Sequence, residues 1–192
     1  MTGHAASARQ AFRVDRAGYP REAWLYERSI WAVAVYRLSN WLGTRFGPRL
    51  ATQPAVVRYT VKIPLLAGQR LAEAFTGVEL PPQTRVGPGL RIWHGGNIVI
   101  NPRSRIGAHC LLRQGVTIGN LVPGGEVPVI GDHVEFGAYA QVLGGITVGD
   151  GARIGSMSVV LQDVPAGATA VGAPARIIAG PDRGGDHEAG PS

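Results

Sequence analysis

The 192-residue sequence has only one cysteine, Cys110, and few aromatic residues, which make up 7% of the chain. One cysteine cannot form an intrachain disulfide, so we expect a reducing, cytoplasmic setting. The same count excludes a zinc site built from several cysteine thiolates. The first twenty residues contain no apolar segment of the kind found at the centre of a signal peptide, so no secretory signal is predicted.

A run of like charges is also missing. The formal net charge is +6, but the nineteen Lys and Arg residues are scattered along the chain. This pattern indicates no nucleic-acid partner and at most a modest preference for small anions. The most apolar stretch, residues 23–42, is interrupted by Glu27, Arg28 and Arg37, so no membrane span is predicted.

Residues 1–78 are predicted to form a short α-helical segment. Residues 23–42 have apolar side chains at helical spacing, which favours a helix packed on the rest of the protein over one lying on a membrane surface. A second helical region, residues 54–75, is expected to bend or restart at Pro64, because proline removes an intrahelical hydrogen bond and clashes with the preceding turn.

From Val86 onward, glycine becomes dense and apolar residues recur every six positions. Large apolar residues lie at multiples of six positions from one another: Ile106, Leu112, Ile118, Ile130, Phe136, Val142, Val148, Ile154 and Val160. Small or β-branched residues lie four places further on, at Cys110, Val116, Val134, Ala140, Ile146, Ala152 and Ser158. Only Gly124 breaks the first series, within "GNLVPGGEVP", which we expect to be an extruded loop. Self-similarity at a fixed period predicts a repeat architecture.

Two inward residues per hexad fit a short strand followed by a bend in which glycine relieves crowding. Three such strands would close a triangular coil of about eighteen residues, and stacked coils would satisfy one another's backbone groups. The upstream residues Val86, Ile92 and Ile98 keep the period but are offset by two positions. The offset predicts an irregular junction near residues 98–100.

Three stretches between residues 77 and 179 resemble the hexapeptide-repeat acyltransferases, and within them the serine acetyltransferase-like branch. They are "GVEL" with "WHGGNIVI" after it, the loop followed by "VPVIGDHVEFGAYAQVLGGITVGDGARIGSMSVVLQDVP", and "AVGAPARII". The resemblance implies a left-handed parallel β-helix over residues 79–179, after the helical segment 1–78. The composition of residues 180–192 predicts a disordered tail.

The resemblance also implies a catalytic pair, His94 and Glu79. In that family a histidine acts as the general base on an acceptor hydroxyl, and an upstream carboxylate orients it. The residue types suit this chemistry, because a hydroxyl is a weak nucleophile at neutral pH and an imidazole can accept its proton during attack on a thioester. A carboxylate bonded to the other ring nitrogen would fix the tautomer.

The cosubstrate implied by the resemblance is acetyl-CoA, bound along a groove between adjacent subunits of a homotrimer. A hexamer is the less expected assembly, and no metal is required. In the family, backbone atoms and small side chains contact coenzyme A. The matching positions in this sequence are Gly137, Ala138, Gly155 and Ser156. Arg153 and Arg176 are candidates to bind its phosphates.

The sequence departs from the serine enzymes around the acceptor. Trp93 stands where an aspartate usually precedes the histidine, and Glu126 and Val127 replace an arginine and a histidine before a proline. Glu126 would repel the carboxylate of a free amino acid. A stacking aromatic at Trp93 suits a sugar ring or another larger hydroxyl compound. We therefore expect an O-acetyltransferase that acts on a small molecule or saccharide, with Trp93 and Glu126 contacting the acceptor.

Three alternatives remain open. The first is a true serine O-acetyltransferase of cysteine biosynthesis, and the second is a non-catalytic sugar-binding or scaffold solenoid. The third is a zinc hydratase on the same solenoid, which needs three converging histidines, for which His94, His109 and His133 are available. We expect His109 and His133 to be exposed turn residues, and Cys110 to be part of the core.

Overall fold

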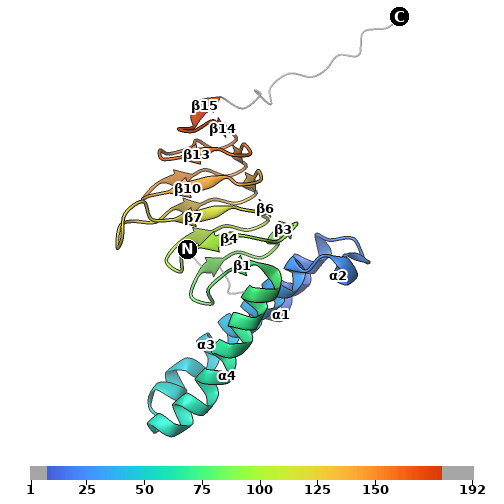
Figure 1. The fold of residues 1–192 in the computed structure, drawn as a ribbon, viewed down its shortest axis with the longest axis vertical. Helices are drawn as coiled ribbons and strands as arrows, with labels where there is room; N and C mark the ends of the chain where they lie inside the picture. Colours follow the sequence, from blue (N-terminus) through green and yellow to red (C-terminus); the bar gives the residue numbers. More distant parts are fainter. Residues whose placement is uncertain (1–7, 179–192) are drawn as a thin grey trace, which may run out of the picture.

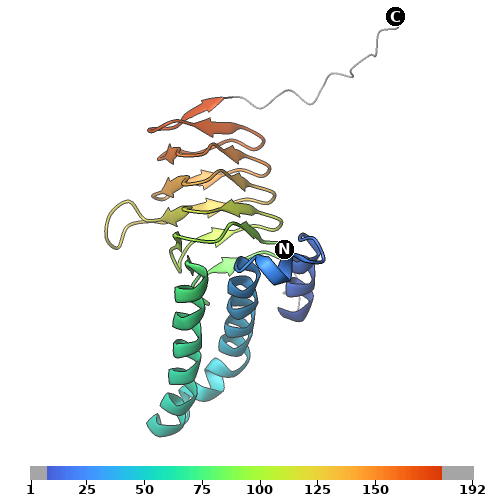
Figure 2. The same cartoon turned by 45° about the vertical axis from the view of Figure 1, so that its right-hand side comes forward.

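A computed structural model describes residues 8–178, and the predicted tail 180–192 lies outside them. Helices at one end are followed by a tall stack of short strands (Figure 1). Within the described residues, four helices come first: α1 (Ala8–Ala17), α2 (Ala23–Tyr26), α3 (Ser29–Ala51) and α4 (Ala55–Thr76). Helices α3 and α4 form a hairpin that projects from the lower end of the stack (Figure 2).

The strands form three sheets, which are the faces of a three-sided β-helix. Face A contains β1 (Val78–Glu79), β4 (Ile98–Ile100), β7 (Thr117–Gly119), β10 (Gln141–Leu143) and β13 (Val159–Val160). Face B contains β2 (Arg85–Val86), β5 (Arg105–Ile106), β8 (Val129–Ile130) and β11 (Thr147–Val148). Face C contains β3 (Arg91–Trp93), β6 (Leu111–Arg113), β9 (Glu135–Phe136), β12 (Arg153–Ile154), β14 (Thr169–Val171) and β15 (Arg176–Ile178). All pairings are parallel except the final one, between β14 and β15. The predicted solenoid is confirmed.

The register of the strands gives the length of each coil. Gln141 pairs with Val159, which lies three hexads further along the chain, as expected for one three-sided coil. Thr117 pairs with Gln141, which lies four hexads further along, because the loop between β7 and β8 adds one hexad and projects from the stack (Figure 2). The extruded loop predicted around Gly124 is confirmed.

The two-residue offset upstream also has a structural counterpart. Val99 pairs with Thr117, which lies three hexads further along, whereas the separation between Arg91 and its partner Leu111 is longer by two residues. The two extra residues therefore lie after Arg91 and before Val99, in the turn 94–97 that connects face C to face A. An irregular junction is confirmed, but it lies just upstream of the predicted residues 98–100, which form the regular strand β4, and it contains the predicted catalytic histidine.

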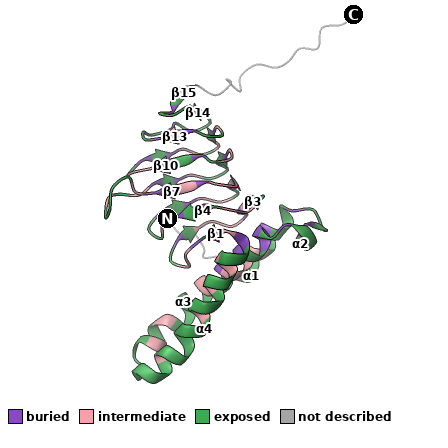
Figure 3. Cartoon of the chain, viewed as in Figure 1, coloured by how far each residue is buried: buried purple, intermediate pink, exposed green. Residues whose placement is uncertain are grey.

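Both periodic series of residues point into the column. Every large apolar position from Ile106 to Val160 is buried, as is every small position from Cys110 to Ser158. Along the strands, buried residues alternate with exposed or partly exposed ones (Figure 3). Phe136, which is 1% exposed, is the largest of the fully buried side chains. The period of six is therefore the packing pattern of one continuous apolar column.

The helical segment covers the open end of this column. Ala32, Val33 and Tyr36 of α3 belong to the same buried cluster as Val78 and Leu80 of the first coil. The predicted packing of this segment on the rest of the protein is confirmed. In the part of the chain that the structure describes, no helix combines the length and apolarity needed to cross a membrane.

Two details of the helix prediction are wrong. The stretch 23–42 is not one helix, because Glu27 is extended and separates α2 from α3. Helix α4 is not restarted at Pro64 but continues through this exposed residue as one helix. The first difference has a direct bearing on the site described below.

Candidate active site

His94 lies in the wide turn between β3 and β4. Its φ angle is 56°, and Asn97 in the same turn has φ 52°. This left-handed region is costly for a residue with a side chain, so surrounding contacts must hold the backbone there. One such contact is a hydrogen bond of 3.2 Å from the His94 N–H to Oε2 of Glu27. The imidazole itself is exposed and is therefore accessible to a substrate.

A buried polar network lies beneath this turn. The Ser29 hydroxyl donates to the carbonyl oxygen of Ile92 at 2.5 Å and lies 2.8 Å from Oε1 of Glu27. The Tyr19 hydroxyl accepts from the Ile92 N–H at 2.6 Å and donates to the Ile92 carbonyl at 3.1 Å. Burial raises the pKa of Tyr19 to about 12, so its phenol is neutral at physiological pH. Three residues of the helical segment thus hold the strand that leads into His94.

A second network joins the helices to the same coil. The buried Asp15 carboxylate lies 2.8 Å from Nε of Arg37, and its Oδ1 also accepts from the backbone N–H groups of Gly89 and Leu90. The Arg37 guanidinium donates to the carbonyl oxygens of Val86 and Gly87. A buried charge pair needs such additional hydrogen bonds to offset its desolvation. The result is a fixed orientation of α1 and α3 on the first coil.

Glu79 is exposed on β1, and the turn of His94 packs closely against the residues before it. A Cβ atom added to Gly95 would lie 3.2 Å from the Thr76 carbonyl oxygen and 3.5 Å from Val78 Cγ2. A Cβ atom on Gly77 would lie 2.8 Å from Gly96 Cα, so only glycine fits at Gly77. Among the described residues no hydrogen bond or ion pair joins the Glu79 and His94 side chains. The orienting role of Glu79 stays a prediction.

The two predicted acceptor contacts have different surroundings. Trp93 is half-buried, with its ring centroid 5.3 Å from that of Tyr19 and 6.4 Å from that of His94. It therefore has a packing role beside the histidine, and acceptor binding by Trp93 stays a prediction. Glu126 is exposed in the extruded loop, and its side chain lies over Gly145 of the next coil. A role for Glu126 at the acceptor also stays a prediction.

The predicted coenzyme A positions gather along the edge between faces C and A. Gly137 and Ala138 follow β9, and Gly155 and Ser156 follow β12. A ladder of backbone hydrogen bonds along this edge includes Gly115 N–H to Gly96 O, Tyr139 N–H to Gln114 O and Met157 N–H to Ala138 O. His94 lies on the same edge, three coils below Ser156. With strands about 4.8 Å apart, this spacing corresponds to roughly 14 Å.

The two predicted phosphate contacts lie on face C near that edge. Arg153 of β12 is 3.9 Å from Glu135 of β9, and both side chains are more than half exposed, so their attraction is weak. Arg176 of β15 is exposed and is paired in register with Val171. Both guanidinium groups are exposed and accessible to a ligand, and their role in binding phosphate stays a prediction.

His109, His133 and Cys110 lie where the sequence predicted. His109 and His133 are exposed residues with φ 57° at the edge between faces B and C, and their rings stack with centroids 5.0 Å apart. Cys110 is buried, and burial raises the pKa of its thiol to about 11, as expected of a core residue. Within residues 8–178, no three His, Cys, Asp or Glu side chains are grouped so as to hold a metal ion.

The residues that position the turn were not identified from the sequence. Tyr19 and Ser29 carry no pattern that marks them, because their partners are far away along the chain, in β3. Glu27 did carry a signal, since it is an acid inside an apolar helical stretch. In the sequence alone, this charge indicates only that the stretch does not span a membrane.

Comparison with known proteins agrees with this architecture. The family model described as bacterial transferase hexapeptide (six repeats) matches residues 128–162. A serine acetyltransferase of Synechococcus elongatus is 38% identical over 149 residues, which cover 77% of this chain and 55% of that protein. Soybean serine acetyltransferase, a solved structure, is 32% identical with a TM-score of 0.73, and the match covers 90% of this chain and 69% of the soybean chain. A serine acetyltransferase solved in complex with CoA is 29% identical with a TM-score of 0.74, covering 90% of this chain and 70% of that one.

The chain belongs to the hexapeptide-repeat acyltransferases, in the serine acetyltransferase branch. It spans 55% of the length of its Synechococcus relative. The matches to these two solved structures cover 90% of this chain. They therefore include most of the helical segment as well as the coils.

Proposed function

We propose that this protein is an acetyl-CoA-dependent O-acetyltransferase that transfers an acetyl group to a hydroxyl of a small molecule or saccharide. The observation that carries the proposal is the exposed His94, held in a left-handed turn by Glu27 on the same edge as Gly137, Ala138, Gly155 and Ser156. Membership of the serine acetyltransferase branch supports both the donor and the reaction.

In this reaction His94 removes the proton of the acceptor hydroxyl. The acceptor oxygen forms a bond to the acetyl carbon, the bond from that carbon to the coenzyme A sulfur breaks, and the proton passes through His94 to the leaving thiolate. Glu79 orients the imidazole from the neighbouring strand, and the close packing of the turn against residues 76–78 supports its proximity. No metal ion takes part in this proposed mechanism.

Coenzyme A lies along the edge between faces C and A. Gly137, Ala138, Gly155 and Ser156 contact it through backbone and small side chains, and Arg153 and Arg176 meet its phosphates. The complex of a relative with CoA supports this class of ligand.

The acceptor is larger than free serine. Trp93 offers an aromatic face beside His94, and the acidic Glu126 of the extruded loop disfavours a free carboxylate. The second candidate function is serine O-acetylation, which the names of the relatives favour.

The protein acts in the cytoplasm as a homotrimer, with a hexamer as the less expected assembly. Large apolar side chains exposed on the α3–α4 hairpin support self-association: Leu38, Trp41, Phe46, Val57, Ile63 and Leu66. Contacts between copies would cover these residues and complete the coenzyme A groove.

The test is thiol release from acetyl-CoA over a panel of amino acids, sugars and glycans. We expect His94→Ala to lower the rate about 10²–10⁴-fold. His133→Ala is the matched control, because His133 is exposed and has the same left-handed backbone on another edge. Equal rates for wild type and His94→Ala on every acceptor would contradict the assignment and favour a sugar-binding or scaffold solenoid. Serine as by far the best acceptor would establish the second candidate.

A further inference from the structure

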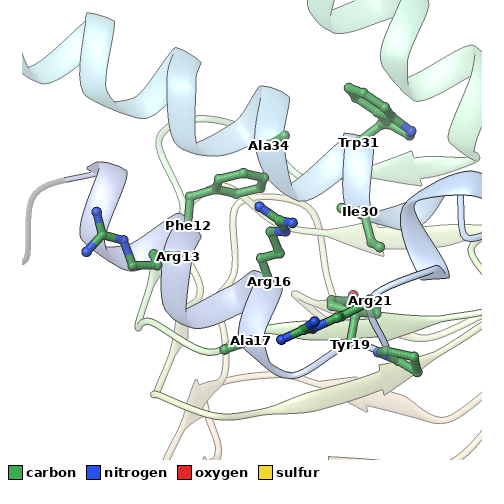
Figure 4. Close-up of a pocket in the computed structure, with 10 residues that line it drawn as sticks. Phe12, Arg13, Arg16, Ala17, Tyr19, Arg21, Ile30, Trp31 and Ala34 are labelled. Carbon is green, nitrogen blue, oxygen red and sulfur yellow. The ribbon is translucent and has the colours of Figure 1, made fainter.

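A hollow in the helical segment has no place in the proposed reaction. It lies between α1, the turn after α1 and the start of α3, with a volume of about 640 Å³ (Figure 4). Its walls combine the aromatic side chains of Phe12, Tyr19 and Trp31 with three arginines, Arg13, Arg16 and Arg21. The volume lies within the range of sites that bind small molecules.

The three arginines have no partners among residues 8–178. No hydrogen bond or ion pair joins any of their guanidinium groups to a described residue, in contrast to Arg37, which is fully paired nearby. Arg16 and Arg21 extend across the space between α1 and the start of α3, whereas Arg13 points outward (Figure 4). The ten described residues drawn there include no Asp or Glu. Unpaired like charges around one hollow repel one another, and an anion would relieve that repulsion.

The residue types define the chemistry of the ligand. A guanidinium presents a fork of donors that matches phosphate or carboxylate oxygens, and it also stacks on planar rings. Phe12 and Trp31 add aromatic faces beside these donors. We propose that this hollow binds an aromatic organic anion of the nucleoside phosphate class, with Arg16 and Arg21 on the phosphate and the aromatic side chains on the base.

The hollow is separate from the proposed coenzyme A edge, yet it adjoins the residues that hold His94. Gly137 and Ser156 belong to later coils, whereas every lining residue precedes the first coil. Tyr19 contributes its ring to the hollow and its hydroxyl to both backbone groups of Ile92. A ligand in this hollow therefore stabilises the arrangement of the helices that hold the His94 turn.

The test measures binding of AMP to the full chain by titration calorimetry and by tryptophan fluorescence, since Trp31 lines the hollow. We expect saturable binding that the double substitution Arg16→Gln/Arg21→Gln weakens ~10-fold or more. The matched control is Arg45→Gln/Arg49→Gln, which removes two exposed arginines from the later part of α3. Arg16→Lys/Arg21→Lys should weaken binding less than the glutamine pair. Thermal unfolding of each variant checks that the fold is retained.

Four outcomes would contradict the proposal. One is the absence of saturable AMP binding, and another is equal affinity in wild type and in the Arg16→Gln/Arg21→Gln variant. The third is loss of AMP binding in Arg153→Gln together with displacement by coenzyme A, which would place AMP on the coenzyme edge. Inorganic phosphate that binds as tightly as AMP would overturn the assignment of an aromatic ligand. Because the readout is binding without turnover, these failures are distinguishable from failure of the proposed acetyl transfer.

Discussion

The side chain of Glu27 and the backbone N–H of His94, far apart in the sequence, are joined by a hydrogen bond of 3.2 Å. The same carboxylate lies 2.8 Å from Ser29 Oγ, which donates to the residue two places before His94. A break between two helices therefore determines the backbone of the proposed catalytic turn. The helical segment is therefore part of the structure of the proposed active site and not only a cover for the solenoid.

Removal of the Glu27 carboxylate should impair catalysis more than coenzyme binding. We expect Glu27→Ala to lower kcat by roughly 10²-fold, because misplacement of a reacting group by about 1 Å can have an effect of that size. The KM for acetyl-CoA should change little, since the proposed coenzyme positions lie on later coils. Steady-state kinetics provide the check. Glu27→Gln keeps an acceptor oxygen and should restore part of kcat, while Glu22→Ala, at an exposed site, should have no effect.

The role of Glu79 can be tested by a double-mutant cycle with His94. If Glu79 acts only by orienting the imidazole, its removal matters only while His94 is present. We expect Glu79→Ala to lower kcat, and the double variant with His94→Ala to be no slower than His94→Ala alone. If the decrease in kcat of the double variant equals the product of the two single decreases, Glu79 acts independently of His94.

The buried Asp15–Arg37 pair should contribute strongly to the free energy of unfolding, because it holds the helices on the first coil. Arg37→Met leaves the Asp15 carboxylate buried without its cation, so we expect a loss of about 3–5 kcal/mol in the free energy of unfolding. Arg70→Met is the control, because Arg70 pairs with Glu73 at the surface and its side chain is 78% exposed. There we expect a change of roughly 0–1 kcal/mol. Urea unfolding followed by tryptophan fluorescence measures both, and equal losses would contradict the prediction.

Alkaline pH should loosen the helical segment through Tyr19. Its pKa is about 12 in the folded protein and 10.0 in the reference state, so folding favours the neutral phenol. The stabilisation, about 2–3 kcal/mol, is complete below pH 10 and is lost as the pH rises from 10 to 12. Unfolding midpoints measured across this window provide the check. Tyr19→Phe should be less stable below pH 10 and should show a smaller decline above it; the remaining decline comes from Tyr36, whose pKa burial also raises.

Two inward serines should respond differently to removal of their hydroxyl groups. Ser104 is buried and its hydroxyl has no hydrogen-bond partner among the described residues, whereas the Ser158 hydroxyl accepts from the Gly172 N–H at 3.1 Å. Ser104→Ala should therefore be neutral or stabilising, and Ser158→Ala should destabilise the protein by about 1 kcal/mol. Thermal unfolding compares the two, and a larger loss for Ser104→Ala would contradict this ranking.

Predictions that depended on the six-residue period agree with the structure. Helix α4 shows where a local rule fails, because the helix continues through the exposed Pro64. The single helix expected over residues 23–42 failed for a related reason. Local spacing cannot detect that Glu27 has hydrogen-bond partners in another element, so the break between α2 and α3 was not predicted.

The sequence by itself determined the coils, the extruded loop, the burial of Cys110 and the presence of an irregular junction, because in a solenoid each short strand pairs with a neighbour at nearly constant separation. Only the tertiary structure decided which side chains hold that turn. Asp15, Tyr19 and Glu27 act on backbone groups of the first coil that are distant in the sequence. Contacts of that range follow from how the helices pack on the first coil, and no repeat in the sequence encodes them.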